Sequence, residues 1–356
     1  MTPSDAISRI YRIIDASRNR IGEGLRLLED VARLLLGEAG VTEQLKVMRH
    51  ELVRLDESLY QRLLESRDSA GDVGVDIEVP GEEKQRDLPT IIVANARRVQ
   101  EELRTLEELA KLPEVAPHLD SEKFKHARFQ LYTIEQDLFG RILRQDKTER
   151  VGGLYVILDT ASLVGRSHIE VARQVIRGGA SVIQLRDKTT PKDELLALAR
   201  ELAALCHENG VLFIMNDYLE LAIAAGADGL HIGREDLPCT EVRKLLPINM
   251  ILGRSVTSVE LAVAAEADGA DYIAVGSMYP TPSKAKAVVV GPEMLSQVRQ
   301  ATSRPLVAIG GITRDNAAEV MATGADAIAV IRAVVSADSP EEAARQIVNE
   351  IEVQDG

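Results

Sequence analysis

The sequence predicts an α/β protein in which an N-terminal all-α helical domain, residues 1–145, precedes a C-terminal (β/α)8 TIM barrel, residues 151–356. The length of 356 residues favours two domains over one. Before residue 150, apolar residues recur at steps of three and four, as in Leu25, Leu28 and Ala32, which is helical spacing. After it, short apolar segments alternate with helical patterns, which is typical of a parallel barrel.

The amino-acid composition argues against several classes of binding partner. The formal net charge is −14 and aromatic residues make up 3%, which opposes binding to a phosphate backbone and leaves few platforms for base stacking. Two cysteines, Cys206 and Cys239, form no Cys-x-x-Cys pair that would indicate zinc or redox chemistry. No run approaches the roughly 20 apolar residues of a membrane span, and the first residues show no signal peptide. We expect a cytoplasmic protein with small-molecule substrates and with no nucleic-acid or membrane partner.

The helical domain contains an internal repeat. Positions of the first helical segment recur at a constant spacing in a later one: Ala16, Arg20, Glu23, Leu25, Arg26, Leu28, Glu29, Ala32 and Arg33 recur as Ala94, Arg98, Glu101, Leu103, Arg104, Leu106, Glu107, Ala110 and Lys111. Two such helices predict a pseudo-symmetric bundle, in which Arg26 and Glu29 can pair three residues apart. The charges could equally be solvated ion pairs, and the helices could equally form the dimerisation face of a homo-oligomer.

Two segments interrupt the helical pattern. Glycine and proline residues predict a long loop over Arg67–Arg86, after which helical patterning resumes before Ile91 and again over Glu122–Leu143. The polar stretch Gln145–Arg150 predicts the junction between the domains.

The barrel follows strand by strand. Predicted strands cover Leu154–Leu158, Ser181–Leu185, Leu212–Met215, Gly229–Ile232, Met250–Gly253, Tyr272–Val275, Leu306–Ile309 and Ala327–Val330, with helices such as Glu194–Glu208 and Asn316–Ala322 between them. A Gly-Ala-Asp turn precedes three of the strands, at residues 226–228, 269–271 and 324–326. These aspartates belong to the strand entrances, so we interpret them as structural.

The active site of a barrel gathers at the carboxyl ends of its strands. The second strand ends in Gln184, Arg186 and Lys188, which alternation places on one side. Two cations converging at a strand end suit a cluster of anionic oxygens, although a surface strip of salt bridges would have the same pattern.

The next two strand ends carry carboxylates. Asp217 follows the third strand directly after Asn216, and Asp236 follows the fourth. Oxygen ligands without cysteine or paired histidine indicate a hard cation such as Mg²⁺. Each aspartate alone could instead be a helix N-cap. His231, at the end of the fourth strand, we interpret as structural.

The last four strand ends offer further anion contacts. Ser255 follows the fifth strand, with Ser258 as a plausible helix cap, and the sixth leads into a loop with Thr281, Ser283 and Lys284. That loop predicts a phosphate-contacting flap, although a plain proline-rich loop would look similar. Gly310-Gly311 after the seventh strand and Ile331-Arg332 after the eighth occupy the usual phosphate site of a barrel.

Together these stretches resemble thiamine phosphate synthase over about residues 151–340. The matching motifs, in the family's order, are Gln184-Leu185-Arg186-Asp187-Lys188, Asn216-Asp217, His231-Ile232-Gly233-Arg234-Glu235-Asp236-Leu237-Pro238, Pro280-Thr281-Pro282-Ser283-Lys284 and Ile309-Gly310-Gly311-Ile312. The resemblance implies that a pyrimidine diphosphate is joined to a thiazole phosphate. It implies these roles: Gln184 and Asn216 contact the aminopyrimidine; Arg186, Lys188, Ser255 and Lys284 hold the diphosphate; Asp217 and Asp236 bind Mg²⁺; Thr281, Ser283, Gly311, Ile331 and Arg332 surround the thiazole phosphate.

The sequence departs from the family pattern at three positions. The family often has Gln at Arg234, a His in some members at Thr257, and commonly a Ser at Arg332. Arg332 could contact the phosphate or carboxylate of the thiazole directly.

The N-terminal half resembles a helical domain that is fused to some thiamine phosphate synthases. The matching stretches are Ile13-Ile14-Asp15-Ala16, Asn19-Arg20 through Glu29-Asp30, Arg67-Asp68 with Asp72-Val73-Gly74, and Asn95 through Glu108. The resemblance implies phosphorylation of hydroxymethylpyrimidine phosphate, with candidate residues Asp15, Asn19, Arg20, Glu23, Arg26, Arg67, Asp68 and Asp72. The sequence has no glycine-rich Walker loop that would support a kinase independently.

Two alternatives remain at this point. The barrel could be a thiazole tautomerase, which binds thiazole phosphate without joining it and needs no full diphosphate clamp. The helical domain could be a scaffold or assembly module without catalysis.

Overall fold

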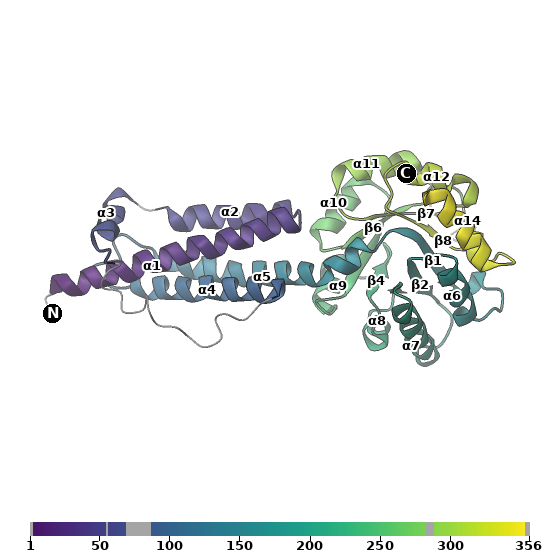
Figure 1. Cartoon of the computed structure of the whole chain (residues 1–356), viewed down its shortest axis with the longest axis horizontal. Helices are drawn as coiled ribbons and strands as arrows, with labels where there is room; N and C mark the ends of the chain where they lie inside the picture. Colours follow the sequence, from purple (N-terminus) through teal and green to yellow (C-terminus); the bar gives the residue numbers. More distant parts are fainter. Residues whose placement is uncertain (1–2, 55, 69–86, 282–287, 353–356) are drawn as a thin grey trace. The chain divides into compact units, whose positions relative to one another are not determined.

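The computed structural model describes residues 3–54, 56–68, 87–281 and 288–352, and the chain divides into two compact units, Met1–Leu143 and Arg144–Gly356. The first unit is helical, and the second is a barrel of strands surrounded by helices (Figure 1). The predicted fold class, an all-α domain followed by a (β/α)8 barrel, is therefore confirmed.

The helical unit contains α1 (Pro3–Asp30), a π-helical turn (Val31–Leu35), α2 (Ala39–Val53), α3 (Glu57–Glu65), α4 (Leu88–Leu109) and the greater part of α5 (Ser121–Glu149). α3 and α4 each begin after an aspartate cap, because Asp56 and Asp87 accept the backbone N–H groups of Leu59 and Thr90. α1 packs against both α2 and α4. The apolar repeat forms the core between them, with Leu25, Leu28, Leu103 and Leu106 buried.

The structure describes the predicted junction and part of the predicted loop. In the junction Gln145–Arg150, α5 continues to Glu149, and the boundary between the two units lies just before it, after Leu143. Pairs four residues apart stabilise these last turns, with Gln145 donating to Glu149 at 2.8 Å and Arg150 to Asp146 at 3.3 Å. In the predicted loop Arg67–Arg86, Arg67 and Asp68 lie outside any helix. Residues 69–86, among them Asp72, lie outside the described residues.

The second unit is a closed barrel of eight parallel strands in sequential order. The strands are β1 (Gly153–Asp159), β2 (Val182–Arg186), β3 (Leu212–Asn216), β4 (Gly229–Ile232), β5 (Ile251–Val256), β6 (Tyr272–Gly276), β7 (Leu306–Ile309) and β8 (Ala327–Val330). The helices outside them are α6 (His168–Arg177), α7 (Lys192–Glu208), α8 (Leu219–Ala225), α9 (Cys239–Leu245), α10 (Val259–Ala267), α11 (Pro292–Ala301), α12 (Arg314–Met321), α13 (Arg332–Val335) and α14 (Pro340–Glu352), with a 3-10 turn at Thr160–Ser162.

Strand alternation divides the barrel residues into two layers. One set of strand residues packs with the outer helices in a large apolar cluster. The alternate set forms the interior cluster, which contains Tyr155, Val182, Leu212, Ile251 and Tyr272 among others. Because neighbouring residues of a strand face opposite sides, this register fixes which polar residues reach the interior at each strand end.

The three Gly-Ala-Asp turns form strand clips at the amino end of the barrel. In each, the aspartate before an even strand accepts the backbone N–H of the preceding odd strand: Asp228 from Phe213 at 3.0 Å, Asp271 from Leu252 at 2.8 Å and Asp326 from Leu306 at 2.7 Å. This arrangement agrees with the structural interpretation of these aspartates.

Two of the strand clips also hold the end of α5. Arg144 donates to Asp271 at 2.8 Å, and both side chains are 6% exposed. Lys147 lies 3.3 Å from Asp228. Val151, two residues beyond α5, is buried in the interior cluster. Residues 144–151 therefore close the amino end of the barrel and belong to its fold.

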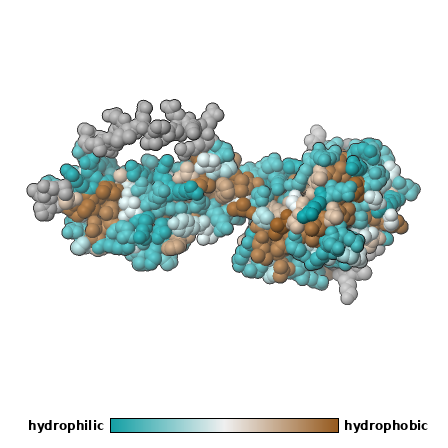
Figure 2. Space-filling model, turned by 90° about the horizontal axis from the view of Figure 1, so that it is seen from below, coloured by the Kyte–Doolittle hydropathy of each residue, from teal (hydrophilic) through white to brown (hydrophobic). Residues whose placement is uncertain are grey.

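Hydrophilic residues cover most of the visible face of both units, and hydrophobic residues gather there in separate patches (Figure 2). Within the described ranges, none of the helices is both long and apolar enough to span a membrane.

Candidate active site at the carboxyl end of the barrel

The strand residues predicted to contact substrate take interior positions at the carboxyl end of the barrel. Gln184 and Arg186 lie two and four residues after Val182 on β2, so they share its interior face. Asn216 lies four residues after Leu212 on β3 and likewise shares its interior face. Ser255 has the parity of Ile251 on β5, and Ile331 packs against the interior cluster beyond β8. The register therefore brings these predicted residues to one mouth.

Arg186 is held at the mouth by an aspartate that the sequence analysis did not select. Its Nη1 lies 2.5 Å from Oδ1 of Asp159, the last residue of β1 and its partner in the strand register. Asp159 is buried and also accepts a hydrogen bond from Ser162 at 2.9 Å. The rule that selected the other strand ends would also have found Asp159 at the end of the first strand.

Asp217 and Asp236 lie together on neighbouring strand ends. Asp217 has a left-handed backbone (φ 65°), which an aspartate tolerates better than most residues, and its N–H donates to the carbonyl of His231 at 2.9 Å. Oδ2 of Asp236 accepts the N–H of Gly233 at 2.6 Å. Burial, followed by the charge of Asp217 and a hydrogen bond with it, raises the pKa of Asp236.

This carboxylate pair fits a hard divalent cation. Two neighbouring carboxylates repel each other when both are ionised, and a cation between them relieves that repulsion. The described part of the chain contains no group of three or more His, Cys, Asp or Glu side chains suited to a metal. Mg²⁺ usually takes only one or two protein carboxylates and completes its shell with water and substrate phosphate, so two aspartates suffice.

Lys188 lies beside this pair. Its Nζ is 3.0 Å from Oδ2 of Asp217, while the lysine side chain is 58% exposed. The preceding residue, Asp187, is buried and anchors the loop that carries Lys188. It accepts hydrogen bonds from Thr160, Thr189 and Thr190 at 2.6 to 3.0 Å. Burial alone would raise the pKa of Asp187, but these hydrogen bonds outweigh it and hold that pKa well below its usual range.

Five polar side chains form an interior hydrogen-bond chain beneath the mouth. Gln184 Nε2 lies 2.8 Å from the hydroxyl of Tyr155, which lies 3.1 Å from that of Tyr272. The Tyr272 hydroxyl is 3.1 Å from Nδ1 of His231, and Nε2 of His231 is 2.8 Å from Oγ of Ser255. Burial raises the pKa of both tyrosines, so both are neutral phenols at physiological pH.

The loops after β6, β7 and β8 are described in part. Thr281 is described, whereas Ser283 and Lys284 lie outside the described residues. Gly311 has a φ of 68°, and a β-carbon there would collide with Tyr279 and with the carbonyl of Pro280. The loops after β6 and β7 thus approach each other at Gly311 with no room for a side chain. Arg332, the first residue of α13, is exposed.

In the helical unit, the repeated Arg–Glu pairs form two clamps, each around a buried glutamate. Glu29 binds Arg26 of its own helix at 3.5 Å and Arg49 of α2 at 2.8 Å. The repeat partner Glu107 binds Arg104 at 2.7 Å and Arg128 of α5 at 2.9 Å. The two glutamates are only 3% and 5% exposed, whereas Arg26 and Arg104 are 49% and 55% exposed, so each repeated pair is solvated on its arginine side alone.

The clamps affect one candidate for phosphoryl transfer. Arg26 contacts Glu29 and also Asp30 at 3.2 Å, so its guanidinium already has two carboxylate partners within the bundle. The Arg26 side chain is also 49% exposed, and its contact with a phosphate stays a prediction.

A second polar cluster gathers other candidates. Arg67 binds the buried Asp15 through two hydrogen bonds of 2.7 and 3.1 Å, and Arg18 lies 3.8 Å from the same carboxylate. Arg12 donates to the carbonyl of Asp68 at 2.7 Å. Outside this cluster, Arg20 binds Glu102 at 2.8 Å, and Asn19 and Glu23 are exposed.

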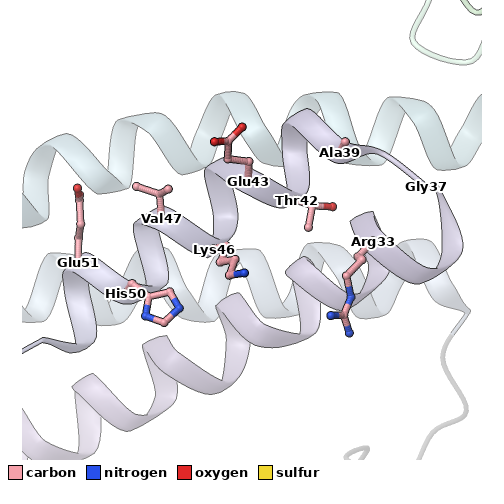
Figure 3. A pocket seen from close by; sticks show the side chains of 9 residues that line it. All are labelled: Arg33, Gly37, Ala39, Thr42, Glu43, Lys46, Val47, His50 and Glu51. Carbon is pink, nitrogen blue, oxygen red and sulfur yellow. The ribbon is translucent and has the colours of Figure 1, made fainter. Parts of the chain in front are cut away.

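The helical unit also has an open pocket of about 690 Å³ on α2 and the segment before it. Figure 3 shows the side chains that line it: Arg33, Gly37, Ala39, Thr42, Glu43, Lys46, Val47, His50 and Glu51. None of the described residues predicted for phosphorylation is among them.

Two families match different parts of the chain. Residues 154–334 match the family described as thiamine monophosphate synthase, and residues 12–137 match the ThiD2 family.

Relatives of similar length carry the same name. A thiamine-phosphate synthase of Nostoc sp. (strain PCC 7120) is 35% identical over 342 residues, which covers 96% of this chain and 94% of the relative. A thiamine-phosphate synthase of Gloeobacter violaceus is 37% identical over 331 residues, covering 93% of this chain and 94% of the relative.

Shorter relatives match only part of the chain. A thiamine-phosphate synthase of Methanospirillum hungatei is 46% identical over 198 residues, which covers 55% of this chain and 96% of that protein. Among solved structures, thiamine phosphate pyrophosphorylase from Pyrococcus furiosus matches with a TM-score of 0.55 and 38% identity, over 58% of this chain and 99% of the other.

Proposed function

Because the chain belongs to the thiamine monophosphate synthase family, we propose that its barrel joins 4-amino-2-methyl-5-(diphosphomethyl)pyrimidine to thiazole phosphate, or to its carboxylated form. With thiazole phosphate the products are thiamine phosphate and diphosphate, and with the carboxylated form CO₂ is released as well. The family assignment makes the chain an enzyme, a transferase of thiamine biosynthesis. The observation that carries the finer proposal is the cluster of Lys188, Asp217 and Asp236 beside Arg186, on three neighbouring strand ends.

The reaction is a substitution at one carbon. The bond between the exocyclic CH₂ of the pyrimidine and the diphosphate oxygen breaks, and its electron pair leaves with diphosphate. The amino-pyrimidine ring stabilises the positive charge on the CH₂ carbon, and the lone pair of the thiazole nitrogen forms the new C–N bond. No proton has to be moved, so the site needs to stabilise charge rather than to provide a base.

The leaving group determines what the cations of the site do. Arg186, Lys188, Ser255 and Lys284 are proposed to hold the diphosphate as negative charge builds on it. Asp217 and Asp236 would hold Mg²⁺, which as a Lewis acid adds positive charge at the leaving oxygens. Asp159 keeps the guanidinium of Arg186 aimed at the mouth, which reduces the entropy lost when substrate binds.

The remaining residues are proposed to orient the two rings. Gln184 and Asn216 offer amide groups to the aminopyrimidine from adjacent strands. Thr281, Ser283, Gly311, Ile331 and Arg332 are proposed to surround the thiazole phosphate. The exposed Arg332 would reach the phosphate or carboxylate of the thiazole from the first turn of α13.

The test of the proposal is coupling by the full chain. The protein is incubated with the pyrimidine diphosphate, thiazole phosphate and Mg²⁺, and the products are identified by mass. We expect thiamine phosphate and one equivalent of diphosphate. Isomerisation of a thiazole phosphate without coupling would favour the tautomerase alternative.

For the helical unit, we propose phosphorylation of hydroxymethylpyrimidine phosphate, which would supply the substrate of the barrel. The match to the ThiD2 family and the cluster around Asp15 and Arg67 support this proposal. The cluster places Arg12, Arg18 and Arg67 near two carboxylates, as phosphate binding with a metal ion would require. Asp68 and Asp72 are proposed as ligands of that Mg²⁺.

The kinase test uses the full chain with ATP, Mg²⁺ and hydroxymethylpyrimidine phosphate. Thiazole phosphate is left out, so that any diphosphate product accumulates. We expect the product to form and to be lost in Asp15→Asn, with Glu122→Gln as a control that alters an exposed ion pair with Lys125 outside the cluster. A folded protein that makes no product and binds no nucleotide would leave the scaffold as the better interpretation.

A further inference from the structure

The interior hydrogen-bond chain connects two groups with opposite predicted tasks. At one end Gln184 faces the predicted aminopyrimidine position, and at the other Ser255 faces the predicted diphosphate position. Three residues without a role in the proposed chemistry, Tyr155, Tyr272 and His231, lie between them. All three are buried, with exposures of 1%, 0% and 7%.

The direction of this chain follows from its donors and acceptors. Gln184 donates an amide N–H to the oxygen of Tyr155, so the single proton of Tyr155 is directed to the oxygen of Tyr272. The proton of Tyr272 is then directed to Nδ1 of His231, which must be an acceptor. A neutral histidine with an acceptor at Nδ1 carries its proton on Nε2, and it donates that proton to Ser255.

We propose that Tyr155, Tyr272 and His231 are positioning residues that fix the hydroxyl of Ser255 as a donor toward the diphosphate. Because Ser255 receives the Nε2 proton, its own proton points away from His231 and toward the mouth of the barrel. At the other end, the Gln184 carbonyl is left as an acceptor for the amino group of the pyrimidine. This proposal rests on the proposed function of the barrel. The three residues determine that the hydrogen-bond chain presents a donor at Ser255 and an acceptor at Gln184.

The opposite direction would oppose anion binding. If Gln184 turned its carbonyl toward Tyr155, every proton of the chain would reverse, and Ser255 would donate to His231. Its oxygen lone pairs would then face the anion. Buried hydrogen-bond chains of this kind hold one direction because a reversed member leaves a polar group unsatisfied.

One residue of β5, Gly253, leaves the space that the interior hydrogen-bond chain occupies. Gly253 pairs with both His231 and Tyr272 in the strand register. A β-carbon at Gly253 would collide with the ring of Tyr272, so any other residue there would displace the hydroxyl that binds His231. The interior hydrogen-bond chain therefore requires glycine at position 253.

The first test reads the tautomer of His231 directly. The full chain is labelled with ¹⁵N-histidine, and its six imidazoles are resolved by NMR, with His231→Gln assigning the relevant signals. We expect the proton on Nε2 in the wild-type protein and a shift toward the Nδ1 form in Tyr272→Phe. A proton on Nδ1 in the wild type, or no change in the variant, would overturn the proposal.

The second test measures binding of inorganic diphosphate with Mg²⁺ by calorimetry. Tyr272→Phe and Tyr155→Phe keep their rings, so the interior remains filled, and we expect diphosphate affinity to fall by roughly 10- to 150-fold, the worth of one hydrogen bond to a charged group. Thr302→Val is the control, because it removes a buried hydroxyl that binds Glu266 on another part of the barrel. Equal affinity in the tyrosine variants and the control would contradict the proposal.

Both tests are independent of turnover. The wild-type protein could show the Nε2 proton and a diphosphate affinity that depends on Tyr155 and Tyr272, yet make no thiamine phosphate. That result would overturn the proposed function and support the positioning roles. A fully active synthase with the proton on Nδ1 would overturn the positioning roles alone.

Discussion

The ammonium group of Lys188 lies 3.0 Å from the carboxylate of Asp217, so a cation predicted for diphosphate and a carboxylate predicted for Mg²⁺ are paired to each other. Lys188 also lowers the pKa of Asp236, although burial and Asp217 outweigh it. Under the proposed function, we expect the lysine to compete with a metal ion for the acid pair and to exchange partners when the diphosphate binds.

Replacing Lys188 should change two affinities in opposite directions. In Lys188→Met, Mg²⁺ alone should bind several-fold more tightly because its competitor is gone, while Mg²⁺-diphosphate should bind roughly tenfold more weakly because a charged contact is lost. Calorimetry with each probe measures both values. Lys192→Met is the control, since that lysine pairs with Glu220 on the surface. A parallel change in both affinities would contradict the competition.

The acid pair should be essential for coupling. Asp217→Asn and Asp236→Asn keep the size of each side chain but remove one negative charge, so synthase turnover should fall by roughly 100-fold or more. Thermal unfolding should show that the variants remain folded. Full synthase activity in excess EDTA would argue against a metal at this position.

Acid should weaken the loop anchored by Asp187. Its folded pKa is lower than the unfolded value of about 3.9, so its contribution to stability is present above that pH and is lost as the pH falls toward the folded pKa. Asp187→Asn should destabilise the barrel by about 1–3 kcal/mol at pH 7, and by less near pH 3.

Urea unfolding at the two pH values measures this difference. The control is Asp338→Asn, an exposed aspartate in the turn before α14, which should change stability little at either pH. A constant difference between Asp187→Asn and wild type across this range would show that the carboxylate charge is not what stabilises the loop.

The barrel should fold alone only when the end of α5 is included. A chain of residues 144–356 keeps the Arg144–Asp271 and Lys147–Asp228 pairs, and it should be soluble and active in coupling. A chain that begins at Val151 leaves Asp271 without Arg144 but with Arg243 at 3.1 Å, and it should be less stable by roughly 1–3 kcal/mol, the cost of losing one hydrogen bond between charged groups.

Urea unfolding of the two chains measures this cost, and Arg144→Met in the longer chain isolates the ion pair. Equal stability of both chains would show that the last turns of α5 are dispensable. A folded and stable 144–356 chain without coupling activity would show that the helical unit completes the site.

The order of elements could be predicted from sequence, and so could both ends of β4, β7 and β8, but the carboxyl ends of β2 and β5 could not. The fifth strand was expected to stop at Gly253, whereas β5 runs through Arg254 and Ser255 to Val256. The second strand likewise extends to Arg186. The apolar pattern stops where the interior becomes polar, and that is where a barrel places its chemistry, so apolar patterning shortens the strands that carry site residues.

The positions of Asp217 and Asp236 after β3 and β4 were predictable because polar residues there follow an apolar strand, while their role as metal ligands stays a prediction. The interior hydrogen-bond chain was not predictable, because Tyr155 and Tyr272 have the spacing of ordinary core residues. Their hydroxyls meet only because β1 and β6 face each other across a closed barrel. The second partners of Glu29 and Glu107 were also hidden, since α2 and α5 supply Arg49 and Arg128 from outside the repeat.

The strand clips have a consequence for how the barrel could be cut and rejoined. Each clip joins an odd strand to the even strand that follows, across 15, 19 and 20 residues for Asp228, Asp271 and Asp326. A circular permutant opened between β4 and β5 keeps all three clips short in sequence. One opened between β3 and β4 turns the Asp228 clip into a contact between the two ends of the new chain, with a larger loop-closure entropy. The barrel should therefore tolerate new termini between its strand pairs better than within them.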